Sequence, residues 1–138
     1  MVSEIAGRVY HRRVAYKVLI VEDSSSMRAF ARATLESNGD IVVEEASNGF
    51  EALRVLSQNH FDAVLLDINM PDINGLELIS FMRKSQVHRQ TPVVIVSTEA
   101  AEKDRNRAIS LGADEYLEKP LEPERLLTVV YGWVKKNE

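Results

Sequence analysis

The chain has 138 residues, of which 45% are hydrophobic and 28% charged, a balance typical of a single soluble globular domain. Its formal net charge of -4 argues against direct binding to nucleic acid, which usually requires a basic stripe. There is no cysteine, which excludes disulfides, thiolate metal sites and thiol catalysis and is compatible with a reducing cytoplasm, where we expect the protein to act.

The wholly apolar runs are short, far below the roughly 20 residues that a membrane-spanning helix needs. We therefore expect no membrane insertion and no signal peptide. Residues 1–15 are mildly basic and lack strong periodicity. We interpret them as an N-terminal extension, either a poorly ordered tail or a docking element, ahead of a domain that covers residues 16–138.

Five apolar stretches that predict strands alternate with five amphipathic stretches that predict helices. The predicted strands cover residues 17–23, 41–46, 61–67, 91–98 and 113–119. The predicted helices lie within residues 24–39, 48–59, 76–90 and 99–111 and from residue 122 onward. Such alternation predicts an α/β fold with a doubly wound parallel sheet. The flavodoxin-like strand order 2-1-3-4-5 fits this pattern, although periodicity alone does not fix the order. Glu44 and Glu45 suggest that the second strand lies at an edge.

Polar side chains stand where four of these apolar strands end. Glu22 and Asp23 end the first strand and Asp67 ends the third, while Ser97 and Lys119 end the fourth and fifth. Alone, each of these residues is more often a turn, cap or solvated side chain. Because the carboxyl ends of parallel strands meet at one edge of the sheet, we expect all of them to lie around one point.

Three carboxylates around one point repel one another and require a positive charge. Oxygen ligands without a neighbouring histidine or cysteine favour a hard cation, and Mg²⁺ is the usual choice. Lys119 would add a second positive charge and Ser97 a hydroxyl group. This combination predicts a phosphoryl site in which Asp67 attacks phosphorus and forms an aspartyl phosphate.

From about Tyr16 to Lys136 the chain resembles the receiver domains of two-component response regulators, close to the single-domain chemotaxis type. The matching motifs are Glu22-Asp23, Asp67-Ile-Asn-Met-Pro, Asn74-Gly-Leu-Glu-Leu, Ser97 and Lys119-Pro120. The resemblance implies that the chain is a phosphoacceptor and not an enzyme, with Mg²⁺-dependent self-phosphorylation and self-dephosphorylation. It also implies a Lys119–Pro120 peptide in the cis form.

The resemblance assigns a role to each matching residue. Asp67 would be the phosphoacceptor, and Asp23, Asp67 and the main-chain carbonyl of Asn69 would bind Mg²⁺, with Glu22 holding a metal-bound water. Ser97 would bond the phosphoryl group and Lys119 would pair with it.

The resemblance further implies a switch in which Ser97 moves toward the phosphate and Tyr116 turns inward. This would change the surface of the fourth helix, fifth strand and fifth helix. The expected partners are a sensor histidine kinase or phosphotransfer protein and a downstream protein target, with the chain a monomer or weak dimer. Asn69 and Glu99 stand at the two positions that tune dephosphorylation in the family, and they predict a phosphoryl state that lasts seconds to minutes.

Other interpretations remain open from the sequence. A haloacid-dehalogenase-type phosphatase would need a second aspartate where Asn69 stands. A flavin binder could use residues 24–26 as a phosphate loop, but Glu22 and Asp23 would repel a metal-free phosphate. The chain could also be a degenerate receiver that acts as a phosphorylation-independent interaction module, or a receiver excised from a larger response regulator or hybrid kinase.

Overall fold

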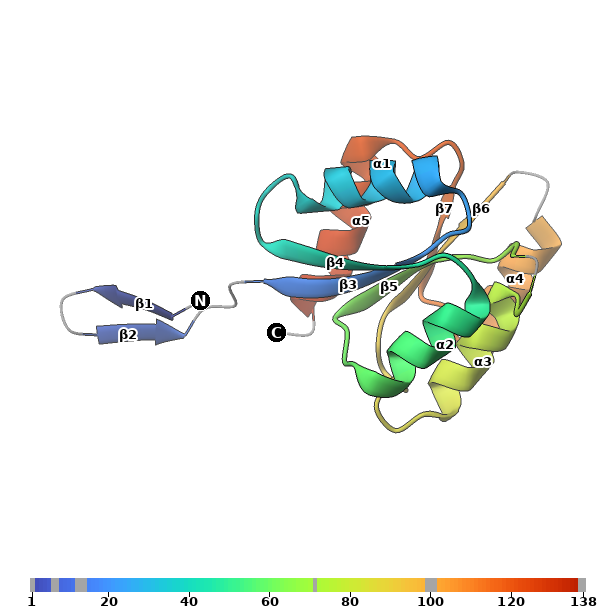
Figure 1. The fold of residues 1–138 in the computed structure, drawn as a ribbon, viewed down its shortest axis with the longest axis horizontal. Coiled ribbons are helices and arrows are strands. Elements are labelled where there is room, and N and C mark those ends of the chain that lie inside the picture. Colours follow the sequence, from blue (N-terminus) through green and yellow to red (C-terminus); the bar gives the residue numbers. More distant parts are fainter. Residues whose placement is uncertain (1, 6–7, 12–14, 71, 99–101, 137–138) are drawn as a thin grey trace.

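The computed structural model describes residues 2–5, 8–11, 15–70, 72–98 and 102–136. Within these ranges a two-stranded hairpin precedes an alternating α/β unit (Figure 1). The strands are β1 (Val2–Ile5), β2 (Arg8–His11), β3 (Tyr16–Val21), β4 (Ile41–Ala46), β5 (Ala63–Asp67), β6 (Val93–Ser97) and β7 (Glu115–Glu118). The helices are α1 (Ser25–Glu36), α2 (Gly49–Gln58), α3 (Gly75–Lys84), α4 (Glu102–Leu111) and α5 (Pro123–Lys136).

The alternating unit is built on a five-stranded parallel sheet with the order β4-β3-β5-β6-β7. If the strands of this sheet are numbered along the chain with β3 as the first, their order is 2-1-3-4-5, which confirms the predicted doubly wound fold. The strand that carries Glu44 and Glu45, β4, lies at an edge as expected. The predicted strand positions are confirmed with ends shifted by a few residues, as at 91–98, where β6 covers only Val93–Ser97.

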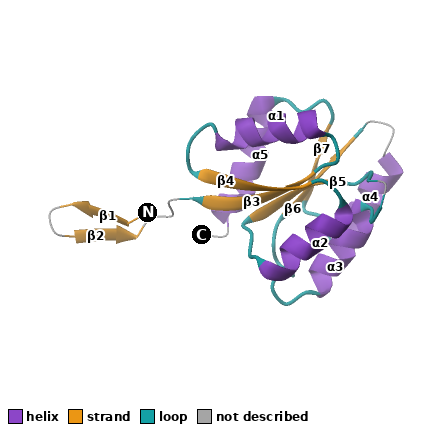
Figure 2. Cartoon of the chain, viewed as in Figure 1, coloured by secondary structure: helices purple, strands orange, loops and turns teal. Residues whose placement is uncertain are grey.

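Helices cover both faces of the sheet: α1 and α5 lie on one side, and α2, α3 and α4 on the other (Figure 2). Successive residues of β3 point to opposite faces, so Val18 and Ile20 pack toward α1 and α5 while Leu19 and Val21 pack toward the other three helices. Every residue of β5 and β6 is buried. Because both faces of these strands are buried, their sequences are continuous apolar runs, and a polar side chain is found only where a strand ends.

Side-chain caps begin the helices next to the carboxyl edge of the sheet. The Ser24 hydroxyl accepts a hydrogen bond from the Met27 N–H at 3.3 Å, the role in which serine is a favoured residue before a helix. The Asn48 and Asn74 side chains accept from backbone N–H groups at the starts of α2 and α3 in the same way. At the opposite ends of α1 and α4, Gly39 and Gly112 have φ of 81° and 118°, the conformations that suit glycine after a helix.

Part of the N-terminal stretch, which the sequence left open as a poorly ordered tail or a docking element, forms secondary structure. Residues of β1 and β2 pair as an antiparallel hairpin, with Val2 opposite His11 and Ile5 opposite Arg8. Each strand has only four residues, which is too short for an alternating pattern to be recognised in the sequence. Among the described helices, none combines the length and the hydropathy that crossing a bilayer would demand.

Candidate active site

Four parallel strands deliver their polar residues to one edge of the sheet. Glu22 follows β3 directly, Asp67 and Ser97 are the last residues of β5 and β6, and Lys119 follows β7 directly. The register aligns these ends, because Asp67 lies opposite Val96 on β6 and Ser97 lies opposite Glu118 on β7. The arrangement predicted from the strand ends therefore forms in the folded chain.

Three carboxylates gather at this edge. Glu22, Asp23 and Asp67 each place one carboxylate oxygen within 4.8 Å of the others. Glu22 and Asp67 are 5% and 4% exposed, whereas Asp23 is exposed to solvent. The donors are all oxygen and carry a clear excess of negative charge. This set of residues fits a hard divalent cation such as Mg²⁺, with an open side toward solvent.

Lys119 supplies the positive charge of the cluster. Its Nζ lies 3.1 Å from Glu22 Oε1 and 3.3 Å from Asp67 Oδ2. Burial acts to lower the pKa of Lys119, but the hydrogen bond to Glu22 and the charges of both carboxylates outweigh it and raise this pKa above its usual value. Burial and the charge of Asp67 raise the pKa of Glu22, despite the Ser24 N–H and Lys119 bonds. One lysine therefore does not fully offset the buried acids.

Ser97 is available for a new hydrogen bond. Its side chain is 1% exposed, and within the described part of the chain its Oγ has no hydrogen-bond partner. The backbone holds it in place, because the Ser97 carbonyl accepts the Lys119 N–H at 2.8 Å. A buried hydroxyl without a partner is costly. A phosphoryl oxygen bound beside Asp67 could accept a hydrogen bond from this hydroxyl.

The remaining predicted residues lie around this cluster or outside the described residues. Asn69 has an exposed side chain, and its N–H donates to Asp67 Oδ1 at 3.0 Å. Tyr116 is 46% exposed, with the Arg105 guanidinium 4.8 Å from its ring centre, so the structure shows the outward position. Glu99 lies outside the described residues. The Lys119–Pro120 peptide is cis, as predicted.

The loop between Asp67 and α3 is anchored on the neighbouring helix by a residue that we did not predict. The Asp72 carboxylate accepts the N–H groups of Gly49 and Phe50, both at 3.0 Å. Burial acts to raise the pKa of Asp72, but these bonds and those from the Asp72 and Ile73 N–H groups together outweigh it and hold this pKa below its usual value. At the end of the loop, the Gly75 N–H donates to the Ile68 carbonyl, and a Cβ on Gly75 would lie 2.6 Å from the Ile68 Cα. Gly75 thus permits a close approach beside Asp67.

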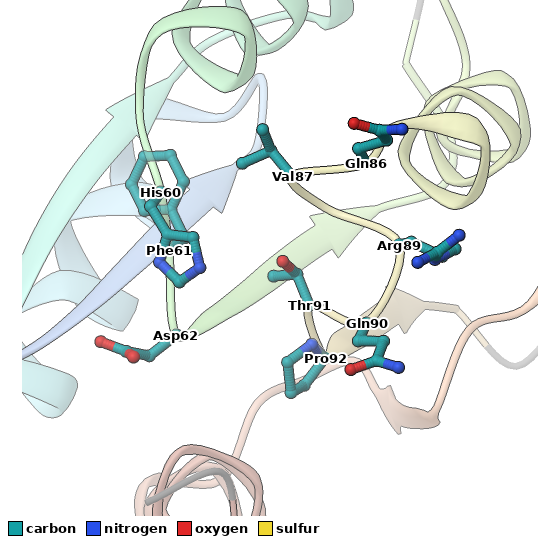
Figure 3. Close-up of a pocket in the computed structure, with 9 residues that line it drawn as sticks. All are labelled: His60, Phe61, Asp62, Gln86, Val87, Arg89, Gln90, Thr91 and Pro92. Carbon is teal, nitrogen blue, oxygen red and sulfur yellow. The ribbon is translucent and has the colours of Figure 1, made fainter.

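A cavity of about 400 Å³ lies at the opposite edge of the sheet, between the segments before β5 and β6 (Figure 3). Its lining includes His60, Asp62, Arg89 and Thr91 and none of the predicted site residues. The Asp62 carboxylate accepts the Lys17 N–H at 2.8 Å, which fixes it to β3. This cavity is therefore separate from the acidic cluster.

Comparisons with known proteins agree with this geometry. The family model for the response regulator receiver domain matches residues 18–131. A chemotaxis protein CheY homolog from Campylobacter jejuni is 38% identical over 111 residues, which cover 80% of this chain and 85% of that protein. The chemotaxis protein CheY4 of Vibrio cholerae is 34% identical, with a TM-score of 0.80 over 86% of this chain and 98% of its own.

A further similar structure bears on the metal. The receiver domain of a sensor histidine kinase from Pseudomonas aeruginosa, solved with a magnesium ion coordinated in the active site cleft, has a TM-score of 0.80 and 26% identity. It covers 88% of this chain and 98% of its own. These findings favour the receiver interpretation over a phosphatase or a flavin binder. The chain therefore belongs to the response regulator receiver domain family, whose members are phosphorylation-dependent signalling switches.

Proposed function

We propose that this protein is a signalling switch that accepts a phosphoryl group on Asp67 from a histidine kinase or phosphotransfer protein. The observation that carries the proposal is the grouping of Asp67 with two further carboxylates, a paired lysine and a buried serine hydroxyl that has no hydrogen-bond partner among the described residues. A receiver used only for docking would not need this set of groups. The same grouping supports the roles proposed for Glu22, which would hold a metal-bound water, and for Lys119, which would pair with the phosphoryl group.

In the proposed reaction a carboxylate oxygen of Asp67 attacks the phosphorus of a phosphohistidine. The P–O bond forms as the P–N bond breaks, and the electron pair leaves with the imidazole nitrogen. Lys119 is close enough to Asp67 to pair with the phosphoryl oxygens, and the Ser97 hydroxyl donates to one of them. In this proposal Asp23, Asp67 and the Asn69 carbonyl would bind Mg²⁺ and Glu22 would hold a metal-bound water, and the ion would neutralise negative charge during the transfer.

The proposed output follows from the new partner of Ser97. Movement of its side chain toward the phosphate would open space behind it, and Tyr116 would turn in from its exposed position beside Arg105. Arg105 also pairs with Glu118 at 3.2 Å, so the inward movement of Tyr116 would change the contacts between α4 and β7. We propose that the altered surface of α4, β7 and α5 binds a downstream protein target.

Incubation with acetyl phosphate and Mg²⁺ tests the phosphoacceptor directly. Intact-mass spectrometry is expected to show the addition of one phosphoryl group to the wild-type protein, with no addition in Asp67→Asn or in the presence of EDTA. Asp62→Asn is the matched control, because Asp62 lies at the other end of β5, and it should be modified like the wild type. Equal modification of Asp67→Asn would contradict the proposal, and no modification of the wild type would favour the docking-module alternative.

The lifetime of the phosphoryl group is a separate prediction, based on Asn69 and Glu99. We expect the phosphorylated protein to lose its group within seconds to minutes in Mg²⁺ after the donor is removed. Loss of the added mass, followed after rapid gel filtration, measures this lifetime. A phosphoryl group that persists for many hours would overturn the assignment of these two residues while leaving Asp67 as the acceptor.

A further inference from the structure

The acidic turn between β3 and α1 is held by an arginine from the helix that follows it. Arg28 lies one turn into α1, and its Nη1 donates to the Glu22 carbonyl at 2.8 Å and to the Asp23 carbonyl at 3.3 Å. These are the main-chain groups of two of the three clustered acids. The turn is fixed further by the Ser24 N–H, which donates to Glu22 Oε2 at 3.0 Å.

Arg28 is itself held by the edge strand β4. Its Nε lies 3.1 Å from Glu45 Oε1, and the other oxygen of Glu45 lies 2.6 Å from Arg32 Nη1. The next residue on β4, Ala46, accepts the Glu22 N–H at 3.0 Å. Thus β4 supports the acidic turn twice, directly through the backbone and indirectly through the Glu45–Arg28 pair. The Arg28 side chain is only 18% exposed, which limits screening of this pair by water.

We propose that Arg28 is a positioning residue. It holds the carboxylates of Glu22 and Asp23 at a fixed distance from the Asp67 carboxylate, so that the three can share one cation. The inference rests on the proposed metal-dependent function. A guanidinium near a cation site opposes cation binding through its charge. Its hydrogen bonds to both carbonyls act in the other direction, because they hold the ligands ready before the cation arrives. Partners that orient metal ligands typically change metal affinity by about 10–100-fold when they are removed.

Magnesium titration by calorimetry separates these two effects by their sign. Arg28→Met is expected to weaken Mg²⁺ binding by about tenfold. Removal of a nearby positive charge without loss of positioning would instead strengthen binding. Arg54→Met, at an exposed position on α2, makes the same change in net charge and is expected to leave Mg²⁺ affinity unchanged. Arg28→Lys keeps the charge but lacks the planar fork, so its affinity should fall between those of the wild type and Arg28→Met.

Glu45→Gln tests the support of Arg28 without altering Arg28 itself, and it remains informative if Arg28→Met does not fold. We expect it to weaken Mg²⁺ binding by a smaller factor, about threefold, because it leaves the carbonyl bonds in place. Urea unfolding without metal shows whether each variant is folded at the titration temperature. If the wild type binds Mg²⁺ and the folded Arg28 and Glu45 variants bind it equally well or better, the positioning role is wrong. If the wild type itself does not bind Mg²⁺, the proposed function fails as well.

Discussion

Replacement of Arg83 by methionine is expected to lower the free energy of unfolding by about 3 kcal/mol, because it leaves several partly buried acceptors without a donor. Arg83 lies in the last turn of α3. Its guanidinium donates to the Gly112 carbonyl at 2.7 and 2.9 Å and to the Thr91 carbonyl at 2.9 Å. It also pairs with Asp114 at 3.0 Å, and the same Asp114 oxygen accepts the Val93 N–H. One side chain therefore joins α3, the start of β6 and the turn after α4.

Urea unfolding of Arg83→Met, followed by circular dichroism, measures this loss. Arg107→Met, at an exposed position on α4, is the control for loss of one positive charge and is expected to change stability by less than about 0.5 kcal/mol. Arg83→Lys should recover little stability, because an ammonium group cannot reach the spread of carbonyls that the planar fork reaches. Equal stability of Arg83→Met and Arg107→Met would show that the network contributes nothing measurable.

The sequence was sufficient to predict the features that depend on local pattern. The apolar runs of β3, β5 and β6 are interrupted by acids or a hydroxyl only where each strand ends, so Glu22, Asp67 and Ser97 could be assigned to one edge of the sheet. Ser24 could be recognised as a helix cap because serine is a common residue there. The strand order fitted a known doubly wound pattern but did not follow from the alternation alone, since alternation permits more than one such order.

The residues that the sequence did not reveal act through contacts between distant segments. Arg28 and Arg83 each lie on a helix where a charged residue is expected at the surface, and their carbonyl partners carry no side-chain signal. Asp72 follows Pro71 and had only the signature of a turn residue, although its carboxylate caps α2, 22 and 23 residues away at Phe50 and Gly49. The asparagine–glycine pair at 48–49 indicated the start of a helix, where an acidic side chain could bind the free N–H groups. The sequence did not indicate which acidic residue would do so.

Lys119→Met is expected to destabilise the metal-free protein at about pH 7 by about 2 kcal/mol, because it leaves two buried carboxylates without their shared cation. Among the lysines that the structure describes, Lys119 is the one that contacts both Glu22 and Asp67. Loss of one partner from a fully buried pair costs about 3–5 kcal/mol, and the smaller value expected for Lys119 reflects the 23% exposure of its side chain. Lys103→Met, at an exposed position on α4, is the control for charge and should have little effect.

The dependence of this loss on pH identifies its cause. The pKa of Glu22 is already raised by burial and by Asp67, and removal of Lys119 raises it further. A carboxyl group whose pKa is higher in the folded than in the unfolded protein stabilises the folded state most at a pH below its unfolded pKa of 4.5. This stabilisation is lost as the pH rises through the pKa of the folded state. The difference in free energy of unfolding between variant and wild type, measured by urea unfolding in EDTA, should therefore shrink from about pH 7 to about pH 5.

Addition of Glu22→Gln to the Lys119→Met variant should recover most of the lost stability at about pH 7, because it removes one of the two repelling charges. A loss that is equal at both pH values and additive with Glu22→Gln would mean that Lys119 stabilises the edge by packing and not by its charge.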